Sequence, residues 1–543
     1  MVMSKQSKVK YIFVTGGVLS SLGKGIAAAS LGMLLEHRGL KISMMKFDPY
    51  INVDPGTMNP YQHGEVYVTE DGAETDLDLG HYHRFTHSAL SKKSSVSTGQ
   101  IYNEVIRRER RGDYLGKTVQ VIPHITDEIK QRILACGAIE EDVDIAIIEI
   151  GGTVGDIESL PFLESIRQFK NEHPEDCLTI HLTYVPYIKS AGEVKTKPTQ
   201  HSVQTLRSIG IVPDMILCRC EEHLSQENKD KIALFCNVHK GYVFDAVDVS
   251  TTVYEVPLHF SKGAIDQAII DHFKLKAYKA DLTPWNALIE AIKNPKETVN
   301  IGIVGKYVQH QDAYKSIYES LHHAGAHLGV KVQLVTFDPE KLDLEGDKKE
   351  IKKCHGVLVP GGFGNRGWEG KIAIAEYCRT HKIPYFGICL GMQVLAVSFA
   401  RNVLKLEEAN STEMDSESTH PVISLLEEQR LVTDRGGSMR LGNCLCHLQP
   451  ASKAKKAYGS EKIFERHRHR YEFNNQYRAD FEKAGVVFSG IYEKDNLVEI
   501  CEIKDHPWMV GVQFHPEFQS KPIQPHPLFF HFVKAALDEK HNG

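Results

Sequence analysis

One cysteine lies in a setting typical of a catalytic nucleophile. Residues 384–393 read Pro-Tyr-Phe-Gly-Ile-Cys-Leu-Gly-Met-Gln, which places Cys389 between Gly387 and Gly391 where an apolar run gives way to a helix-forming one. A side chain on so sharp a strand-to-helix turn projects out of the sheet, and the two glycines leave room for it. The turn also places the sulfur at a helix N-terminus, whose partial positive charge favours the thiolate. The alternative is a cysteine that serves only as a small buried hydrophobic residue.

A histidine and a glutamate near the C-terminus can complete the chemistry of that nucleophile. Residues 510–517 read Val-Gly-Val-Gln-Phe-His-Pro-Glu, so an extended backbone would direct His515 and Glu517 to the same side. Together with Cys389 they form a nucleophile, a base and an acid that orients the base. The glycine run at residues 360–364 follows a short apolar strand and offers backbone N–H groups for an oxyanion.

A second chemical centre is predicted near the N-terminus, where the chain reads as a phosphate-binding loop. The segment predicts a strand, a glycine-rich loop and a helix, at residues 11–15, 16–25 and 26–38. Backbone N–H groups of the loop would face an anion, and Lys24 would supply a mobile positive charge. The strict P-loop pattern fails, because Val18 replaces the first glycine and Gly25 replaces the hydroxyl residue that normally contacts magnesium. A magnesium ion would therefore need other ligands.

Two acidic features can supply those ligands. Residues 69–80 hold five carboxylates, Asp78 among them, and the apolar strand at residues 145–150 carries Glu149 just before two glycines. A carboxylate at the C-terminal end of a buried strand points into the crevice where α/β sheets bind ligands. Asp78 and Glu149 can therefore hold a magnesium ion that bridges nucleotide phosphates. For the acidic run as a whole, a solvated surface loop is the alternative.

A lysine-rich segment follows in the same half of the chain. Residues 190–200 read Ser-Ala-Gly-Glu-Val-Lys-Thr-Lys-Pro-Thr-Gln, and Lys231 opens a helix-like run at residues 231–235. Clustered lysines with hydroxyl groups suit a triphosphate, although an exposed loop would have the same composition. The phosphate loop and the acidic residues that precede the segment favour the triphosphate.

Composition limits the classes of function. The chain has 543 residues, enough for two or more domains with their own cores. A hydrophobic fraction of 42%, a charged fraction of 25% and a net charge of -6 lack the basic excess of a general nucleic-acid binder, so no nucleic-acid partner is expected. The first ten residues are polar and no apolar run approaches membrane length, which predicts a cytoplasmic protein without membrane association.

The eleven cysteines favour neither a disulfide framework nor a metal site. They form no C-x-x-C pair, and we expect the C-x-C pairs Cys218/Cys220 and Cys444/Cys446 to lie in strands.

Between the two chemical centres, a mixed polar segment with Pro284 and Pro295 predicts a linker. A new apolar strand at residues 299–304 then begins a second α/β domain.

These motifs together resemble two known families. The Gly-Ile-Cys-Leu-Gly turn around Cys389, with His515 and Glu517, resembles the class I, or triad, glutamine amidotransferases. Five further segments resemble the synthetase half of the CTP synthases, at residues 11–26, 46–50, 71–82, 149–161 and 192–200. The implied fold is α/β, with a P-loop-type parallel-sheet synthetase (amidoligase) domain at residues 1–275, a linker at 276–298 and an α/β amidotransferase domain at 299–543.

The resemblance implies an activity and its small-molecule partners. It implies ATP-dependent amination of UTP to CTP at C4, with ammonia from glutamine, as a step of pyrimidine nucleotide biosynthesis. Mg²⁺ is the implied cofactor, ATP the co-substrate, GTP the allosteric activator and CTP the feedback inhibitor. A homotetramer is the implied working form.

The resemblance also assigns residues to each site. Cys389, His515 and Glu517 are the implied catalytic residues, and Asp78 and Glu149 the implied magnesium ligands. The implied ATP site comprises Ser21, Leu22, Gly23, Lys24, Gly25, Ile26, Asp78, Val247, Asp248 and Val249. The implied UTP and CTP site comprises Ser20, Asp156, Ile157, Glu158, Lys195, Thr196, Lys197, Pro198, Thr199, Gln200 and Lys231, with residues 156–158 on the CTP side. The implied glutamine site comprises Gly362, Leu390, Gly391, Met392, Gln393, Glu413 and Arg470.

Two other functions remain open on the sequence alone. One is a different glutamine-dependent amidoligase with a P-loop domain, acting on another acceptor such as a corrinoid ring. The other is a P-loop ATPase switch that carries a silent amidotransferase domain, which the intact Cys389, His515 and Glu517 argue against.

Overall fold

The computed structural model describes residues 9–342, 350–425 and 438–542, and it divides the chain into two compact units. The first unit comprises residues 1–54 and 78–289, and the second comprises residues 55–77 and 290–543. Residues 55–77, which lie inside the first predicted domain, therefore pack with the second unit. The predicted linker contains a helix of its own, α11 (Thr283–Lys293).

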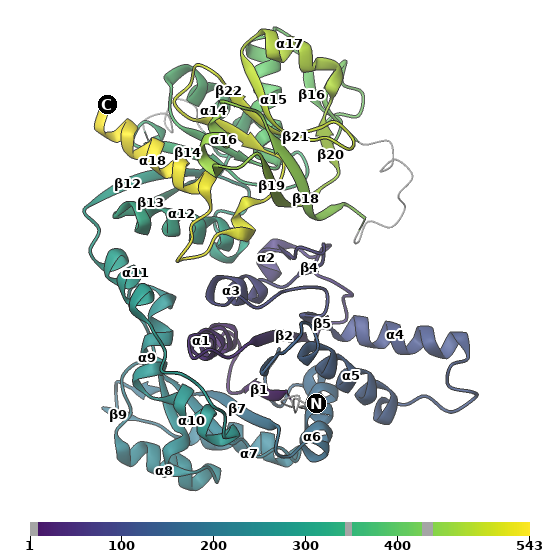
Figure 1. Ribbon diagram of the computed structural model, residues 1–543, viewed down its shortest axis with the longest axis vertical. Helices are drawn as coiled ribbons and strands as arrows, with labels where there is room; N and C mark the ends of the chain where they lie inside the picture. Colours follow the sequence, from purple (N-terminus) through teal and green to yellow (C-terminus); the bar gives the residue numbers. More distant parts are fainter. Residues whose placement is uncertain (1–8, 343–349, 426–437, 543) are drawn as a thin grey trace, which may run out of the picture. The chain divides into compact units, whose positions relative to one another are not determined.

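A seven-stranded parallel sheet forms the centre of the first unit (Figure 1). The strand order is β11-β10-β7-β1-β6-β2-β5, and every neighbouring pair is parallel, which confirms the predicted parallel sheet. The strands are β1 (Lys10–Gly16), β2 (Ile42–Asp48), β5 (Ser95–Ser97), β6 (Ile145–Ile150), β7 (Cys177–Tyr184), β10 (Met215–Cys220) and β11 (Val243–Val247).

Helices cover both faces of this sheet, because successive side chains of each buried strand point to opposite faces. Ala146 and Ile148 of β6 pack in a core with α5 and α6, whereas Ile147 between them lies near Gly32 of α1. The helices of the unit are α1 (Lys24–Glu36), α3 (Asp78–Phe85), α4 (Thr98–Arg111), α5 (Thr126–Gly137), α6 (Leu160–Glu172), α7 (Lys197–Ser208), α8 (Gln226–Cys236), α9 (Val256–Lys262) and α10 (Ile265–Phe273).

Two helices of the first unit begin earlier than the sequence predicts. Helix α1 begins at Lys24 because Gly23, with φ of 94°, ends the phosphate loop in a left-handed conformation that glycine tolerates. Helix α8 begins at Gln226 because the Ser225 side chain caps it by accepting a bond from the Asn228 N–H. Lys231 therefore lies within α8 and does not open it.

The second unit is built on a nine-stranded mixed sheet (Figure 1). Its order is β13-β12-β14-β15-β23-β22-β21-β18-β19; the first five strands run parallel and the remaining pairs are antiparallel. The strands are β12 (Glu297–Val304), β13 (Val330–Phe337), β14 (Gly356–Val359), β15 (Tyr385–Ile388), β18 (Arg440–Leu448), β19 (Lys462–His469), β21 (Val486–Tyr492), β22 (Leu497–Ile503) and β23 (Met509–Val512).

Smaller elements complete the second unit. A three-stranded sheet contains β16 (Ala409–Ser411), β17 (His420–Leu425) and β20 (Tyr471–Phe473). Residues 55–77 contribute α2 (Pro60–His63) and the hairpin of β3 (Tyr67–Val68) and β4 (Glu74–Thr75). The principal helices are α12 (Lys315–Leu328), α14 (Trp368–His381), α15 (Leu390–Asn402), α16 (Lys453–Tyr458), α17 (Arg478–Lys483) and α18 (Pro527–Asn542).

Two further observations concern the cysteines and the length and polarity of the helices. Both C-x-C pairs lie in strands, β10 and β18, as predicted, and all eleven cysteines are free thiols. Within the described ranges, every helix is too short or too polar to cross a membrane.

Candidate active sites

Cys389 occupies the predicted strand-to-helix turn. Strand β15 ends at Ile388 and α15 begins at Leu390, so Cys389 alone joins them, with φ of 51° and ψ of −102°. A side chain at Gly387 would lie 2.5 Å from the backbone of Gly391. A side chain at Gly391 would in turn lie 2.1 Å from the Val359 carbonyl oxygen. The strained nucleophile therefore needs glycine on both sides.

His515 and Glu517 lie together as predicted, although the backbone that joins them is not extended. Strand β23 ends at Val512, and Pro516–Gln519 forms a 3₁₀ turn. The fixed φ of Pro516 suits the first position of such a turn, which explains why the strand does not continue. His515 Nδ1 lies 2.7 Å from Glu517 Oε1, and both side chains are buried.

The charge on His515 is set by its neighbours. Burial alone would lower the pKa of His515, but Glu517 and Cys389 outweigh burial and raise that pKa to about 10. The imidazolium form is therefore held between a carboxylate and the sulfur of the nucleophile, an arrangement typical of an activated cysteine.

A cavity of about 470 Å³ in the second unit opens onto these residues. Its lining includes Gly361, Gly362, Cys389, His515 and Glu517. A side chain at Gly361 would lie 2.9 Å from His515 Cε1 and 3.6 Å from Cys389 Cβ, so the glycine loop lies directly against the catalytic pair. Backbone groups of this loop are thus close to the sulfur, as an oxyanion site requires.

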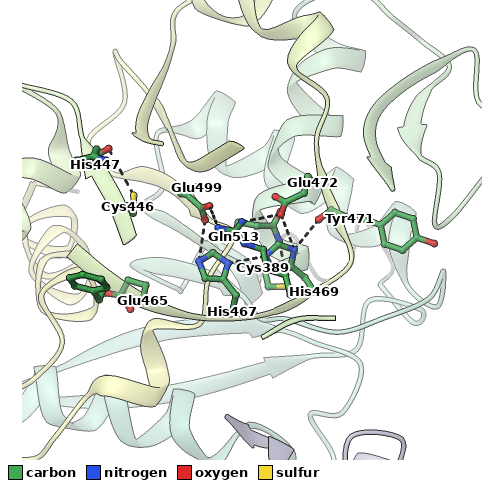
Figure 2. A network of polar contacts seen from close by, with 12 residues as sticks. Cys389, Cys446, His447, Glu465, His467, His469, Tyr471, Glu472, Glu499 and Gln513 are labelled. Carbon is green, nitrogen blue, oxygen red and sulfur yellow. Dashed lines mark hydrogen bonds and ion pairs between the residues drawn. The ribbon is translucent and has the colours of Figure 1, made fainter. Parts of the chain in front are cut away.

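Gln513 is a contact of the nucleophile that the sequence interpretation missed. Its side chain is fully buried, and Nε2 donates to Cys389 Sγ at 3.6 Å while Oε1 accepts from Gln393 at 3.4 Å (Figure 2). Gln393, predicted to bind glutamine, also donates to the Tyr471 carbonyl oxygen at 3.3 Å. The available signal was the position of Gln513, two residues before His515 in the same run.

A buried ionic network lies beside the nucleophile in Figure 2. Arg440 pairs with Glu472 at 3.0 Å and with Glu499 at 2.7 Å, and Glu499 lies 3.3 Å from His467. His467 Nδ1 in turn lies 2.8 Å from His469 Nε2. Burial raises the pKa of Glu472 to about 8, while Arg440 opposes that shift. The network joins β18, β19, β20 and β22, and β22 pairs with β23, the strand that ends one residue before Gln513.

Of the other residues predicted to bind glutamine, Glu413 and the first turn of α15 lie against the glycine loop at residues 360–364. Glu413 accepts a bond from the Gly364 N–H at 2.6 Å, and burial raises the pKa of Glu413. Arg470 follows β19 and donates to Ser438 Oγ at 3.0 Å. The predicted set Leu390, Gly391, Met392 and Gln393 forms the buried first turn of α15.

Residues 55–77 form part of the wall of the cavity that contains Cys389, and no pattern in the sequence predicted this. Arg468 of β19 donates to Glu74 Oε1 at 2.8 Å and to the Gly56 carbonyl oxygen at 3.0 Å. Glu65 accepts a bond from the Ser316 N–H at 2.8 Å. A segment more than 300 residues earlier in the chain thus lines the cavity that contains Cys389.

In the first unit, the predicted phosphate loop folds around Lys24. The Lys24 stem packs on Gly16, where an added Cβ would lie 2.7 Å from Cδ, and Nζ donates to the Gly152 carbonyl oxygen at 2.6 Å. Burial lowers the pKa of Lys24, while Glu149 opposes that shift. A Cβ on Gly25 would lie 2.1 Å from Asp78 Oδ1, which explains why glycine replaces the usual hydroxyl residue.

The two predicted magnesium ligands lie in this neighbourhood. Asp78 contacts Lys46, and Glu149 accepts a bond from Tyr82. Burial, and then Asp78, raise the pKa of Glu149 to about 8, so the two carboxylates oppose each other's charge. A divalent cation would remove that repulsion, and the donor set therefore fits Mg²⁺. In the described part of the chain, no three His, Cys, Asp or Glu side chains form a metal-binding group.

The remaining predicted nucleotide residues fall into two groups. A cavity of about 410 Å³ is lined by residues at the start of α1 and at the end of β11. They include Leu22, Gly23 and Ile26 from the first region and Val247, Asp248 and Val249 from the second. Arg219 joins the same two regions, donating to Asp248 at 2.9 Å and to the Ser21 carbonyl oxygen at 3.0 Å.

The predicted triphosphate residues form the second group. Lys195 pairs with Glu193, and the pKa of Glu193 is lowered by Lys195 and, to a smaller extent, by Lys231. Lys197 lies over the Phe235 ring, and Thr196, Thr199 and Gln200 are buried at the start of α7. Ser20 is exposed on the phosphate loop. Asp156 accepts from the Thr153 N–H and lies near enough to Lys24 to influence its pKa, whereas Ile157 is 82% exposed.

Comparison with known proteins agrees with both halves of this arrangement. A family model of the CTP synthase N-terminus matches residues 10–275, and a model of the class-I glutamine amidotransferases matches residues 309–535. The CTP synthase of Protochlamydia amoebophila is 63% identical over 532 residues, covering 98% of each chain. The CTP synthase of Chlamydia felis is 58% identical over 97% of each chain. The glutaminase domain of Trypanosoma brucei CTPS, solved with bound acivicin, matches 44% of this chain and 94% of its own at 38% identity and a TM-score of 0.42. The chain therefore belongs to the CTP synthase family.

Proposed function

We propose that this protein makes CTP by aminating UTP at C4, with ammonia from glutamine and with ATP as the phosphoryl donor. The observation that carries the proposal is the constellation in the second unit, where Cys389 occupies a strained turn and His515 lies 2.7 Å from Glu517. Free ammonia is useful only if an acceptor is activated to receive it. The phosphate loop of the first unit supports that activation.

The glutaminase step follows from the geometry of the second unit. The Cys389 thiolate attacks the amide carbon of glutamine, so that a C–S bond forms and the C–N bond breaks. His515 donates the proton with which ammonia leaves, and Glu517 keeps the imidazole oriented for that transfer. Backbone N–H groups near Gly362 and Leu390 stabilise the oxyanion. Water then hydrolyses the thioester, which releases glutamate and restores the thiolate.

The substrate is held by charge as well as by shape. We assign the half-buried carboxylate of Glu413 to the α-ammonium group of glutamine and the guanidinium of Arg470 to its α-carboxylate. Gln393 lies close to the nucleophile, because its amide bonds to Gln513, which contacts Cys389, and to the Tyr471 carbonyl oxygen. We include it in the glutamine site.

The synthetase step belongs to the first unit. Lys24 binds the phosphates of ATP and balances the charge that develops as the γ-phosphoryl group passes to O4 of UTP. The bond to the β-phosphate breaks and an O4–P bond forms, so O4 leaves as phosphate when ammonia attacks C4. Asp78 and Glu149 would hold the magnesium ion, which, when bound, neutralises phosphate oxygens.

The remaining assignments rest on family membership. Ser20, Lys231 and residues 195–200 bind the triphosphate that UTP and CTP share, while residues 156–158 meet the CTP nucleoside. Residues 21–26 and 247–249 bind ATP. GTP acts as an allosteric activator, and the working form is a cytoplasmic homotetramer.

The test is CTP formation from UTP, ATP, Mg²⁺ and glutamine, with other carbonyl acceptors assayed in parallel. The proposal expects CTP only when UTP, ATP and glutamine are all present. Glutaminase activity without CTP would show that the acceptor is a different molecule. Loss of glutaminase activity as well would indicate a nucleotide-binding protein whose amidotransferase unit is silent.

A further inference from the structure

A buried histidine that the mechanism above does not use lies under the phosphate loop. His181 is in the middle of β7 and has no exposed surface. Its Nδ1 lies 2.9 Å from Thr15 Oγ1, in the adjacent strand β1, and its Nε2 lies 2.8 Å from Ser202 Oγ, in α7. One side chain thus joins the strand that leads into the phosphate loop to the helix that carries Lys197, Thr199 and Gln200.

The three side chains form a chain of bonds with a single direction. Thr15 Oγ1 donates to the Ile180 carbonyl oxygen at 3.5 Å, so it accepts from the N–H on His181 Nδ1. His181 Nε2 is then the acceptor for the Ser202 hydroxyl group. The chain requires the neutral imidazole, and burial, followed by the positive charge of Lys24, lowers the pKa of His181 to about 3. An imidazolium would donate from both ring nitrogens, so the Ser202 hydroxyl group would have to reverse its role and accept.

The phosphate loop rests directly on this pair. A Cβ added at Gly17 would lie 1.7 Å from Ser202 Oγ and 3.2 Å from His181 Nε2. The Gly17 N–H also donates to the Leu182 carbonyl oxygen at 3.0 Å, so the loop is bonded to β7 beside His181. A shift of α7 would therefore press on the loop backbone, and a shift of the loop would press on α7.

We propose that His181 is a positioning residue that couples the two nucleotide sites of the first unit. Through Ser202 it fixes α7 in the middle of the helix, and through Thr15 and the contact with Gly17 it fixes the phosphate loop. The spacing between the phosphoryl donor and its acceptor is then set by one buried side chain. This inference rests on the proposed roles of Lys24 and residues 195–200.

The test compares variants of the full-length protein in two assays. The first measures binding of a non-hydrolysable ATP analogue with and without UTP, which gives the factor by which each nucleotide strengthens the other. Typical coupling factors are about 5 to 150. In His181→Phe and in Ser202→Ala the factor should fall towards one, while the affinity for each nucleotide alone changes little.

The second assay measures ammonium-dependent CTP synthesis at saturating ATP and UTP. Misplaced reactants lower the rate of the chemical step, so kcat in His181→Phe should fall about 10- to 100-fold with small changes in either KM. His181→Gln can place its amide oxygen near the position of Nε2, where it would accept the bond from Ser202, and should recover part of the coupling. Thr15→Val and Ser202→Ala should be non-additive in combination, because they interrupt one chain.

Thr183→Val is the matched control. Thr183 is buried two residues along the same strand, and its hydroxyl donates to Thr199 in the same helix at 3.3 Å, yet none of these contacts reaches β1. The variant should keep the coupling factor and kcat within about twofold of wild type. Unchanged coupling in His181→Phe, or an equal loss in Thr183→Val, would overturn the proposal. If the wild type made no CTP at all, the proposed function would fail instead.

Discussion

At the scale of single residues, the two sites depend on ionisable side chains whose pKa values are set by neighbouring charges as well as by burial. His515 is buried, yet Glu517 and Cys389 raise its pKa to about 10. Glu149 is buried beside Asp78, and its pKa rises to about 8. The first arrangement keeps a cation beside a nucleophile, and the second leaves two carboxylates that a divalent cation would stabilise. Both arrangements make predictions about charge-neutralising substitutions.

Glu517→Gln should lower glutaminase kcat/KM by about 10²- to 10⁴-fold, because the general acid loses its orienting carboxylate. It should also change the pH profile. His515 must be protonated to act, so activity persists below its pKa and falls as pH rises through it, near pH 10 in the wild type. Without Glu517, burial is opposed only by Cys389, so the pKa falls and the loss begins at lower pH.

The pH profile of kcat/KM for glutamine hydrolysis checks this expectation. Glu461→Gln is the control, because its side chain is 81% exposed and pairs only with Lys455 at 3.5 Å among the described ion pairs. An alkaline limb at the same pH in Glu517→Gln and in wild type would contradict the proposed role of Glu517.

Asp78→Asn and Glu149→Gln should weaken magnesium binding in CTP synthesis while preserving the nucleophile. Each substitution keeps the shape of the side chain and removes a ligand charge, so the Mg²⁺ concentration at half-maximal rate should rise about 10- to 100-fold or more. Alkylation of Cys389 should proceed at the wild-type rate, because Cys389 lies in the other unit. Normal magnesium dependence in both variants would show that other residues hold the ion.

At the scale of elements, β19 joins the catalytic cavity to the buried network. Its side chains alternate between the two faces of the sheet. Arg466 and Arg468 bind residues 55–77, whereas His467 and His469 join the network around Arg440. The Cys389 Sγ lies 4.0 Å from the Arg468 carbonyl oxygen, and the His515 N–H donates to the Arg466 carbonyl oxygen at 2.8 Å. The network therefore holds a strand that contacts two catalytic residues.

Arg440→Met should destabilise the second unit by about 3–5 kcal/mol, because it leaves Glu472 and Glu499 buried without their cation. The reactivity of Cys501, a buried thiol in β22, measures the local opening of this sheet by labelling and peptide mapping. Labelling of Cys501 should accelerate about 10²- to 10³-fold in the variant.

A surface ion pair in the same unit provides the comparison. Arg478 begins α17 and lies 3.0 Å from Glu482, four residues later in the same helix, and both side chains are partly exposed. Arg478→Met should cost less than about 0.5 kcal/mol and leave Cys501 protected. Equal labelling rates in the two variants would show that the Arg440 network does not stabilise the sheet.

At the scale of the whole molecule, the compact units do not follow the order of the chain. After β2 the chain leaves the first unit, and residues 55–77 form part of the wall of the amidotransferase cavity. The chain returns to the first unit at Asp78, the first residue of α3. Asp78, a proposed metal ligand of the first unit, thus follows directly on a segment of the second unit that contacts Arg468 within that unit. The segment that lines the amidotransferase cavity and the proposed metal ligand of the synthetase unit are therefore consecutive in the chain.

The sequence predicted those features that are encoded in neighbouring residues. The turn at Cys389, the phosphate loop and the buried strand of Glu149 each depend on glycines or apolar runs that stand next to the functional residue. Contacts between distant segments could not be predicted in this way. The Arg468–Glu74 pair joins residues 394 positions apart, and Arg440 pairs with Glu472, 32 positions away, and with Glu499, which is further along the chain. The alternation within one strand does not specify such partners.

The most direct test of the account separates the source of ammonia from its use. Full-length wild type, Cys389→Ala and Lys24→Ala are each assayed for CTP formation from UTP and ATP, once with amide-labelled ¹⁵N-glutamine and once with ammonium salts. We predict that Cys389→Ala loses synthesis from glutamine and keeps synthesis from ammonium, because only the nucleophile is lost. Lys24→Ala should lose both, because the phosphoryl transfer to UTP precedes any use of ammonia. Loss of both activities in a folded Cys389→Ala variant, or unlabelled CTP from labelled glutamine in the wild type, would contradict the account.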